Sequence, residues 1–272
     1  MRRSNIDISV VIFIAIVLGS AAGMFGAFYY FKINVRSQVF KEAQELQEVA
    51  RNVPVLTVSS TPDQAPEKTE TTTSTPVIKT VVGAFNLDIA FFPQAPKKVW
   101  DAAHEDYCEE ASLLGVHAFL QNKKFSLDEM DAELEKMRVW EVAQFGYFES
   151  TSLEQTARIA REYLGYKKVR IIENPTIEMI RAEVSAGRPV IVPANGKLLK
   201  NPYFKNGGPV FHMYTVRGFT EKGGVIVNDP GTQHGENFVY SPENVLSSMH
   251  DWNHAQDITM VASGEPRVLV IE

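Results

Sequence analysis

The chain has 272 residues, of which 44% are hydrophobic and 22% are charged, and its formal net charge is −6. This composition is that of a globular protein and excludes disorder along the whole chain. The acidic balance disfavours a general nucleic-acid binder, so no nucleic-acid partner is expected. The single cysteine, Cys108, excludes an intramolecular disulfide and leaves a buried, an intermolecular or a reactive thiol.

Residues 8–31 contain no charged side chain. At about 1.5 Å per residue, a helix of this length crosses the roughly 30 Å hydrocarbon layer of a membrane. We therefore predict an N-terminal transmembrane anchor within residues 1–31, a single-pass chain and an extracytoplasmic domain. The flanking basic residues are nearly balanced, so they set this orientation weakly. Small residues at 20–22 leave a cleaved signal peptide as the alternative.

Two segments connect the predicted anchor to the rest of the chain. Residues 32–53 are expected to form a juxtamembrane helix that ends before Pro54. Its 4-3-4-3 apolar spacing is compatible with a weak homodimer through residues 33–53, but Phe40 and Val49 widen the stripe and favour an amphipathic helix lying on the membrane or on the domain. Residues 54–80 are rich in Ser, Thr and Pro, which predicts a flexible linker.

Residues 81–272 are predicted to form one domain. Two patterns of the capping-box type, Ser126-x-x-Glu129 and Thr151-x-x-Glu154, indicate helix starts. The expected helices cover residues 106–120, 127–140, 152–164 and 176–186, and the expected strands cover 168–172, 189–193, 212–219, 224–228 and 267–271. Because helices come first and strands later, the fold class is α+β, with helices packed on a mostly antiparallel sheet.

Cys108 lies at the first turn of its predicted helix. The helix dipole and the free N–H groups there stabilise a thiolate and lower the pKa of a thiol. Asp106, Glu109 and Glu110 are close in the sequence and oppose the anion, so a thiolate needs a cationic partner such as a histidine. The alternative is a buried, inert cysteine.

His212 and Asp229 are candidate partners of this thiol. His212 begins a predicted strand after the loop Gly207-Gly208-Pro209, so a base at this strand end can reach a site. Asp229 follows the next strand, one turn further along the chain, where its carboxylate can orient an imidazole. A thiol on a helix start, a distant histidine and an acid on the adjacent strand follow the order of papain-like enzymes. Structural roles for both residues remain the alternatives.

Residues 88–252 resemble the family thirty-nine cysteine peptidases, the bacteriocin-processing or double-glycine-leader peptidase-like domains of the papain-like group. The resemblance is carried by six pieces in the same order, Phe92-Pro93-Gln94-Ala95-Pro96, Trp100-Asp101, Tyr107-Cys108-Glu109-Glu110-Ala111-Ser112, Gly187-Arg188-Pro189-Val190-Ile191-Val192, His212-Met213-Tyr214-Thr215-Val216-Arg217-Gly218-Phe219 and Val227-Asn228-Asp229-Pro230-Gly231.

The resemblance implies a papain-like fold and a triad of Cys108, His212 and Asp229. It also implies that the side-chain amide of Gln94 and the backbone N–H of Cys108 form an oxyanion hole. The chain departs from the family where Cys-Gly-Pro is replaced by Cys108-Glu109-Glu110, which makes the entrance more acidic. No Walker A motif is present, so processing coupled to export within this polypeptide is not expected.

The function predicted from these residues is amide hydrolysis by a membrane-anchored cysteine peptidase or amidase, with a peptide or cell-wall amide as substrate and no cofactor or metal. The alternative is a papain-like binding module that has lost turnover. A metal site at His250 and His254 is a weaker alternative, and His104 and His117 have no evident partners. Residues 201–208 are expected to form a loop that covers the cleft and shapes specificity.

Overall fold

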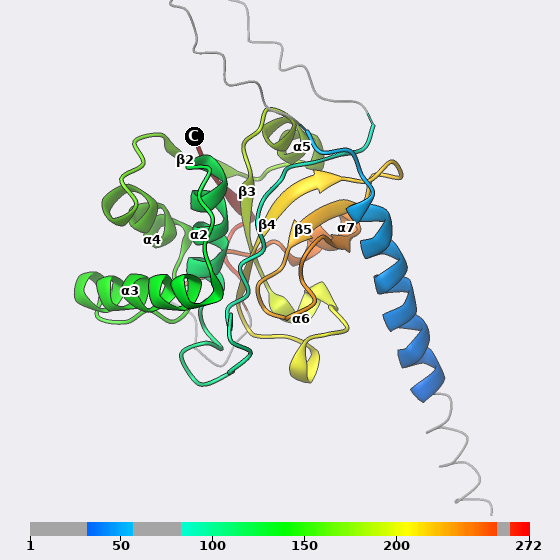
Figure 1. Cartoon of the computed structure of the whole chain (residues 1–272), viewed down its shortest axis with the longest axis horizontal. Helices are drawn as coiled ribbons and strands as arrows, with labels where there is room; N and C mark the ends of the chain where they lie inside the picture. The colour runs from blue at the N-terminus through cyan, green and yellow to red at the C-terminus, as the bar shows by residue number, and fades with distance from the viewer. Residues whose placement is uncertain (1–31, 57–82, 255–261) are drawn as a thin grey trace, which may run out of the picture. The chain divides into compact units, whose positions relative to one another are not determined.

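The computed structural model describes residues 32–56, 83–254 and 262–272 (Figure 1). The chain divides into two compact units, Met1–Glu45 and Leu46–Glu272. The predicted span at residues 8–31 lies outside the described residues. Within the ranges described, no helix has the length and apolar character needed to cross a membrane.

Residues 32–51 are helical, as expected for the segment before Pro54. Its last turns belong to the second unit, where the Gln47 side-chain amide donates to the His234 and Glu236 carbonyls at 2.7 and 3.1 Å. Ala50 and Val53 pack against Ile226. The structured part of the second unit therefore begins well before residue 81.

The first residues of the predicted linker are also paired with the domain. Leu56 N donates to Asn86 O at 2.7 Å, and Asn86 N donates to Pro54 O at 3.0 Å. The apolar Val53, Val55 and Leu56 precede the Ser- and Thr-rich run, which explains why residues 54–56 still pair with the domain. The rest of the predicted linker, residues 57–80, lies outside the described residues.

The second unit is built on one seven-stranded sheet with strand order β2-β7-β3-β4-β5-β6, and β1 pairs with the far end of β4. Every pair of named strands is antiparallel. The strands are β1 (Phe85–Asn86), β2 (Val169–Glu173), β3 (Val190–Ala194), β4 (His212–Phe219), β5 (Val225–Asn228), β6 (Phe238–Tyr240) and β7 (Arg267–Ile271). The α+β class with a mostly antiparallel sheet is confirmed.

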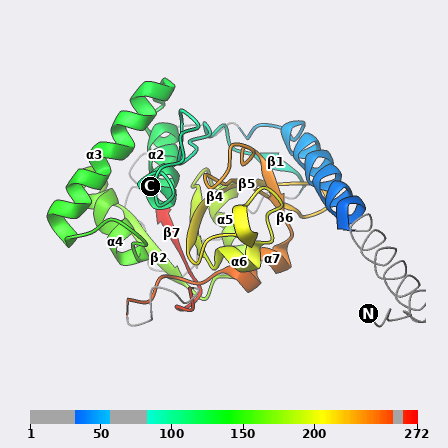
Figure 2. The same ribbon diagram turned by 90° about the horizontal axis from the view of Figure 1, so that it is seen from below.

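The helices flank this sheet, and α2, α3 and α4 gather on one side of it (Figures 1 and 2). They are α2 (Cys108–Leu120), α3 (Leu127–Phe145), α4 (Leu153–Arg158), which continues as a π-helical turn over Ile159–Tyr163, α5 (Ile177–Ser185), α6 (Gly196–Leu199) and α7 (Pro242–Ser248). The Ser126 capping box of α3 is present. The capping box predicted at Thr151 and Glu154 is shifted by one residue. The Ser152 N–H donates to Gln155 Oε1 at 3.1 Å, while the Thr151 N–H donates to Glu109.

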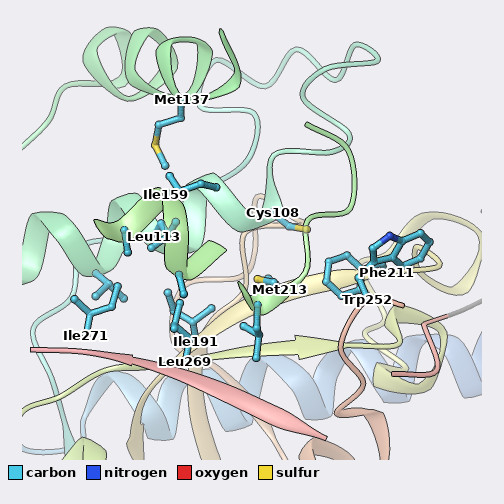
Figure 3. Close-up of a cluster of buried hydrophobic side chains, with 14 of the residues drawn as sticks. Cys108, Leu113, Met137, Ile159, Ile191, Phe211, Met213, Trp252, Leu269 and Ile271 are labelled. Carbon is cyan, nitrogen blue, oxygen red and sulfur yellow. The ribbon is translucent and has the colours of Figure 1, made fainter. Parts of the chain in front are cut away.

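The main hydrophobic core lies between α2, α3, α4 and the strands β3, β4 and β7. Figure 3 shows Cys108 at the rim of this cluster, next to Met213 of β4. The Thr215 hydroxyl donates to Ser112 O at 3.4 Å, so α2 lies directly against β4. This packing brings the first residue of α2 close to the first residues of β4.

Glycine is required where β1 joins β4. A Cβ at Gly218 would lie 2.3 Å from the carbonyl oxygen of Phe85, which is closer than any real contact. Absence of a side chain therefore permits β1 to pair with β4 beyond the end of β3. The chain that follows β1 then runs toward Gln94 and the start of α2.

Candidate active site

A cavity of about 490 Å³ brings together three of the four predicted site residues, Gln94, Cys108 and His212. The segment 203–206 and Gly208 also line it, so the predicted 201–208 loop contributes a wall of the cleft. Other lining side chains are Trp100, Glu105, Asp106, Glu109 and Phe211. A thiol, an imidazole and an amide from three distant parts of the sequence thus meet in one cleft.

His212 is oriented by Asp229. The His212 ring nitrogen Nε2 lies 2.8 Å from Asp229 Oδ1, and both side chains are buried. Asp229 comes directly after β5, which pairs with β4, so the strand register places the carboxylate beside the imidazole. The other ring nitrogen, Nδ1, is thereby left for a partner within the cavity.

Asp229 accepts hydrogen bonds at both carboxylate oxygens. Besides His212, Gly231 N donates to Oδ1 at 3.1 Å, and Asn201 Nδ2 and the Tyr240 hydroxyl donate to Oδ2 at 3.2 and 2.5 Å. Burial raises the pKa of Asp229, but the attraction of a protonated His212 and these donors outweigh it, and the pKa is lowered. The carboxylate is therefore held ionised in a buried position.

Gly231 lies between the His212 imidazole and the Gln94 side-chain amide. A Cβ at this position would meet His212 Cε1 at 2.8 Å, Phe204 Cε1 at 3.0 Å and Gln94 Oε1 at 3.3 Å. The backbone after Asp229 therefore approaches the site closely and limits the rotation of His212. Sequence reasoning singled out the Asp-Pro-Gly run but not this close contact.

Cys108 is the first residue of α2, so its backbone N–H is one of the free donors of the helix start. Its Sγ lies 2.8 Å from Glu109 Oε2 and donates to it. The Met213 backbone also hydrogen-bonds the thiol. Burial first, and then the charge of Glu109, raise the pKa of Cys108 well above its usual value. In this arrangement the sulfur is a thiol.

Two more carboxyl groups lie behind Glu109. The Glu110 and Glu141 side chains are fully buried and face each other, and neither has a hydrogen-bond partner outside the pair among the described residues. Burial, reinforced by the charge of Glu109, raises the pKa of Glu141 to about 9. Burial, with the charge of Glu141, raises the pKa of Glu110 well above its usual value. The acidity that Glu109 and Glu110 were predicted to give the entrance is therefore buried, since Glu109 lines the cavity at 1% exposure and Glu110 lies beneath the site.

Gln94 is held by backbone groups on both sides. Its Nε2 donates to the carbonyls of His104 and Glu105, both at 3.1 Å, and its own N–H donates to Pro230 O at 3.0 Å. Both amide hydrogens are thus engaged with the chain just before Cys108. The amide lies in the cleft, and its predicted part in an oxyanion hole stays a prediction.

A buried arginine that sequence reasoning missed holds the segment leading to Gln94. The Arg217 guanidinium donates to Leu87 O, Ile89 O and the side chains of Asn86 and Asn228, at 2.6 to 2.9 Å. Burial lowers its pKa to about 10. An arginine inside an otherwise buried strand was the available signal, since such a charge needs internal partners.

Four other histidines, His104, His117, His250 and His254, are engaged outside the cavity, while His234 lines it and stacks on Tyr203. His104 bridges Asp101 and Asp131 at 2.7 and 2.9 Å, and His117 Nδ1 lies 3.0 Å from the Tyr166 hydroxyl, partners that were not evident from the sequence. His250 Nδ1 lies 3.0 Å from Gly264 O and His254 Nε2 lies 2.7 Å from Gln155 Oε1. Across the part of the chain that the structure describes, no group of His, Cys, Asp and Glu is placed to hold a metal ion.

Comparisons with known proteins extend this description. A solved structure described as a C39-like peptidase from Bacillus anthracis is 14% identical, covering 72% of this chain and 96% of that chain with a TM-score of 0.38. A fragment of prointerpain A from Prevotella intermedia is 16% identical, covering 54% and 43% with a TM-score of 0.32. No curated protein matches the sequence. The model of the Peptidase_C39 like family matches residues 86–259, and the chain belongs to that family.

Proposed function

We propose that this protein is a cysteine peptidase or amidase that hydrolyses amide bonds through Cys108, His212 and Asp229. The observation that carries the proposal is the shared cleft, in which a thiol at a helix start and an imidazole oriented by a buried carboxylate line one cavity. Membership of a peptidase family supports a peptide substrate.

The reaction proceeds in two acyl-transfer steps. The Cys108 thiol proton passes to His212, and the sulfur attacks the carbonyl carbon of the substrate. His212 then protonates the leaving amine, which departs and leaves a thioester on Cys108. Water attacks this thioester, His212 takes the proton from the water, and the acid product leaves as the thiol is regenerated.

The remaining groups have supporting roles in this proposal. The Cys108 N–H stabilises the oxyanion, and Gln94 joins it after releasing one of its two carbonyl partners. Asp229 fixes the imidazole so that Nδ1 faces the cleft. Residues 8–31 anchor the chain in a membrane, and the segment from residue 57 onward tethers an extracytoplasmic domain that acts on peptides or cell-wall amides.

The test measures release of fragments from fluorescein-labelled casein and from purified peptidoglycan by the full chain. Wild type is expected to cleave one of them, and both Cys108→Ala and His212→Ala are expected to lower the rate by roughly 10³-fold or more. Thermal unfolding of each variant shows that the fold is retained. Full activity in the Cys108→Ala variant would overturn the mechanism, and binding without cleavage by wild type would favour a tethered binding module.

A further inference from the structure

The hydrogen bond made by the nucleophile leads away from its proposed partner. Cys108 Sγ donates to Glu109 Oε2 at 2.8 Å. Among the hydrogen bonds of the described residues, none joins this sulfur to His212, although both line the same cavity. The carboxyl group of Glu109 is therefore the hydrogen-bond acceptor for the thiol proton.

Glu109 is fixed in place on its other side. Thr151 N donates to Oε1 at 2.8 Å, and the Thr151 hydroxyl lies 3.5 Å from the same oxygen. Glu109 is 1% exposed and Thr151 is fully buried, so water does not compete for these contacts. One carboxylate oxygen is held by the segment before α4, and the other is left for the thiol.

The groups around Glu109 give it a proton affinity near neutrality. Asp106 comes from the loop before α2, Glu110 from α2, Glu141 from α3 and His212 from β4. No Lys or Arg of the described chain forms an ion pair with Glu109. Burial raises the pKa of Glu109 to about 7, against the thiol and backbone hydrogen bonds that lower it.

We propose that Glu109 is a positioning residue that controls the nucleophile, holding Cys108 as an unreactive thiol when ionised and releasing it when protonated. This inference rests on the proposed function, since it assigns regulation to the proposed nucleophile. It makes the peptidase an acid-favoured enzyme whose activity falls as Glu109 loses its proton.

The protons balance as follows. In the resting form the carboxylate of Glu109 accepts from the thiol, and His212 is neutral. One proton taken from solution neutralises Glu109, the thiol proton passes to His212, and the neutral carboxyl donates its O–H to the thiolate. The released form is a thiolate, an imidazolium and a neutral carboxyl, with the Met213 backbone hydrogen bond also favouring the anion.

The experiment measures the alkylation rate of the full chain by iodoacetamide from pH 5 to pH 9. Cys108 is the single cysteine in the sequence, so every alkylation event reports on it. In wild type the rate is expected to rise, then fall between about pH 6 and pH 8 as Glu109 ionises, whereas an ordinary thiol rises about tenfold per pH unit. A steady rise through this range in wild type would overturn the proposal.

Glu109→Gln is the decisive variant, because Gln keeps an oxygen for Thr151 N and has no charge. It is expected to lose the falling limb and to react at least about tenfold faster than wild type at pH 8, equivalent to one pKa unit of the thiol. Glu110→Gln is the matched control, since Glu110 is the next residue of α2, is equally buried and makes no hydrogen bond to the sulfur. It is expected to keep the wild-type profile.

The outcomes separate this inference from the proposed function. A folded Glu109→Gln variant that reacts no faster than wild type, or an equal gain in Glu110→Gln, would overturn the proposal. Alkylation requires no substrate, so a falling limb without casein or peptidoglycan cleavage would reject the peptidase and retain the control by Glu109. Cleavage that depends on Cys108, together with an alkylation rate that rises steadily with pH, would retain the peptidase and reject the control by Glu109.

Discussion

On the sheet side of the cleft, the buried Asp229 receives four donors, and its pKa is lowered. On the helix side, the buried Glu109, Glu110 and Glu141 have no cationic partner among the described residues, and their pKa values are raised. Both sides bury carboxyl groups at similar depth. The difference teaches that a cationic partner together with hydrogen-bond donors, and not burial alone, decides whether a buried carboxyl group stays charged.

The largest effect is expected from removing the charge on the sheet side. In Asp229→Asn the new amide can take two orientations. Its NH₂ group either faces the donors Tyr240 and Asn201, or faces His212, which then loses its acceptor. We expect the kcat for a cleaved substrate to fall by about 10²- to 10⁴-fold, as is typical when the acid that orients a catalytic histidine is neutralised. Steady-state kinetics check this, and an Asn variant within threefold of wild type would contradict the role given to Asp229.

Crowding the sheet side is expected to have the next largest effect. Gly231→Ala places a methyl group 2.8 Å from His212 Cε1, so the imidazole must move. We expect kcat/KM to fall about 30-fold with little change in Tm. Gly115→Ala, within α2, is the matched control, because its Cβ would make only ordinary van der Waals contacts, with Ala90 O and Phe92 Cδ2 at 3.6 Å. Equal losses in the two variants would show that the effect is not local to His212.

On the helix side, the expected effect is on stability and depends on pH. Glu141 binds a proton in the folded state up to about pH 9 but loses it near pH 4.5 when unfolded. Folding therefore takes up a proton, and this group lowers stability progressively as pH rises above about 4.5. We expect Glu141→Gln to raise the free energy of unfolding by about 2 kcal/mol at pH 8 and to leave it almost unchanged at pH 4.

Glu135, on the same helix as Glu141, is expected to affect stability with the opposite pH dependence. Its hydrogen bond with Arg138 is the main cause of its lowered pKa, so its contribution is present above the unfolded pKa and is lost as pH falls. Glu135→Gln should therefore lose stability at neutral pH and not gain it. Urea unfolding at several pH values measures both variants, and a pH-independent gain in Glu141→Gln would count against a buried proton.

The smallest effect is expected from removing one donor of four. Tyr240→Phe deletes the hydroxyl that donates to Asp229 Oδ2 and leaves the His212, Gly231 and Asn201 donors. We expect a loss of about 1 kcal/mol in stability. The pKa of Asp229 should rise modestly, which shifts the acid limb of kcat/KM upward with a few-fold loss of activity. A pH profile superimposable on that of wild type would show that three donors suffice.

Strong local patterns predicted most of the sheet and helices. The strands 212–219 and 267–271 match β4 and β7 because alternating or continuous apolar residues mark a buried strand. The α4 start was displaced by one residue, because Ser152 with Gln155 competes with Thr151 and Glu154 for the same role. Strands β1 and β6 are two and three residues long, too short to have a period.

The composition of the site was predictable, but its contacts were not. The spacing of Cys108, His212 and Asp229 indicated a common cleft because paired strands bring the latter two together. The acidic residues next to Cys108 were recognised as opposing a thiolate. The directions in which the Glu109 and Glu110 side chains point were not predictable from the sequence. They depend on Thr151 and Glu141, which reach these two residues only through tertiary packing.

The polar contacts around β1 form a mechanical path through the domain. Residues 54–56 pair with Asn86, the Asn86 side chain accepts from Arg217, and Arg217 donates to Asn228, the residue before Asp229. A pulling force on the chain before residue 46 first loads the Gln47 hydrogen bonds and the packing of Ala50 and Val53 against Ile226, and then these bonds. Tension would therefore reach the strand that precedes the carboxylate before it reaches α2.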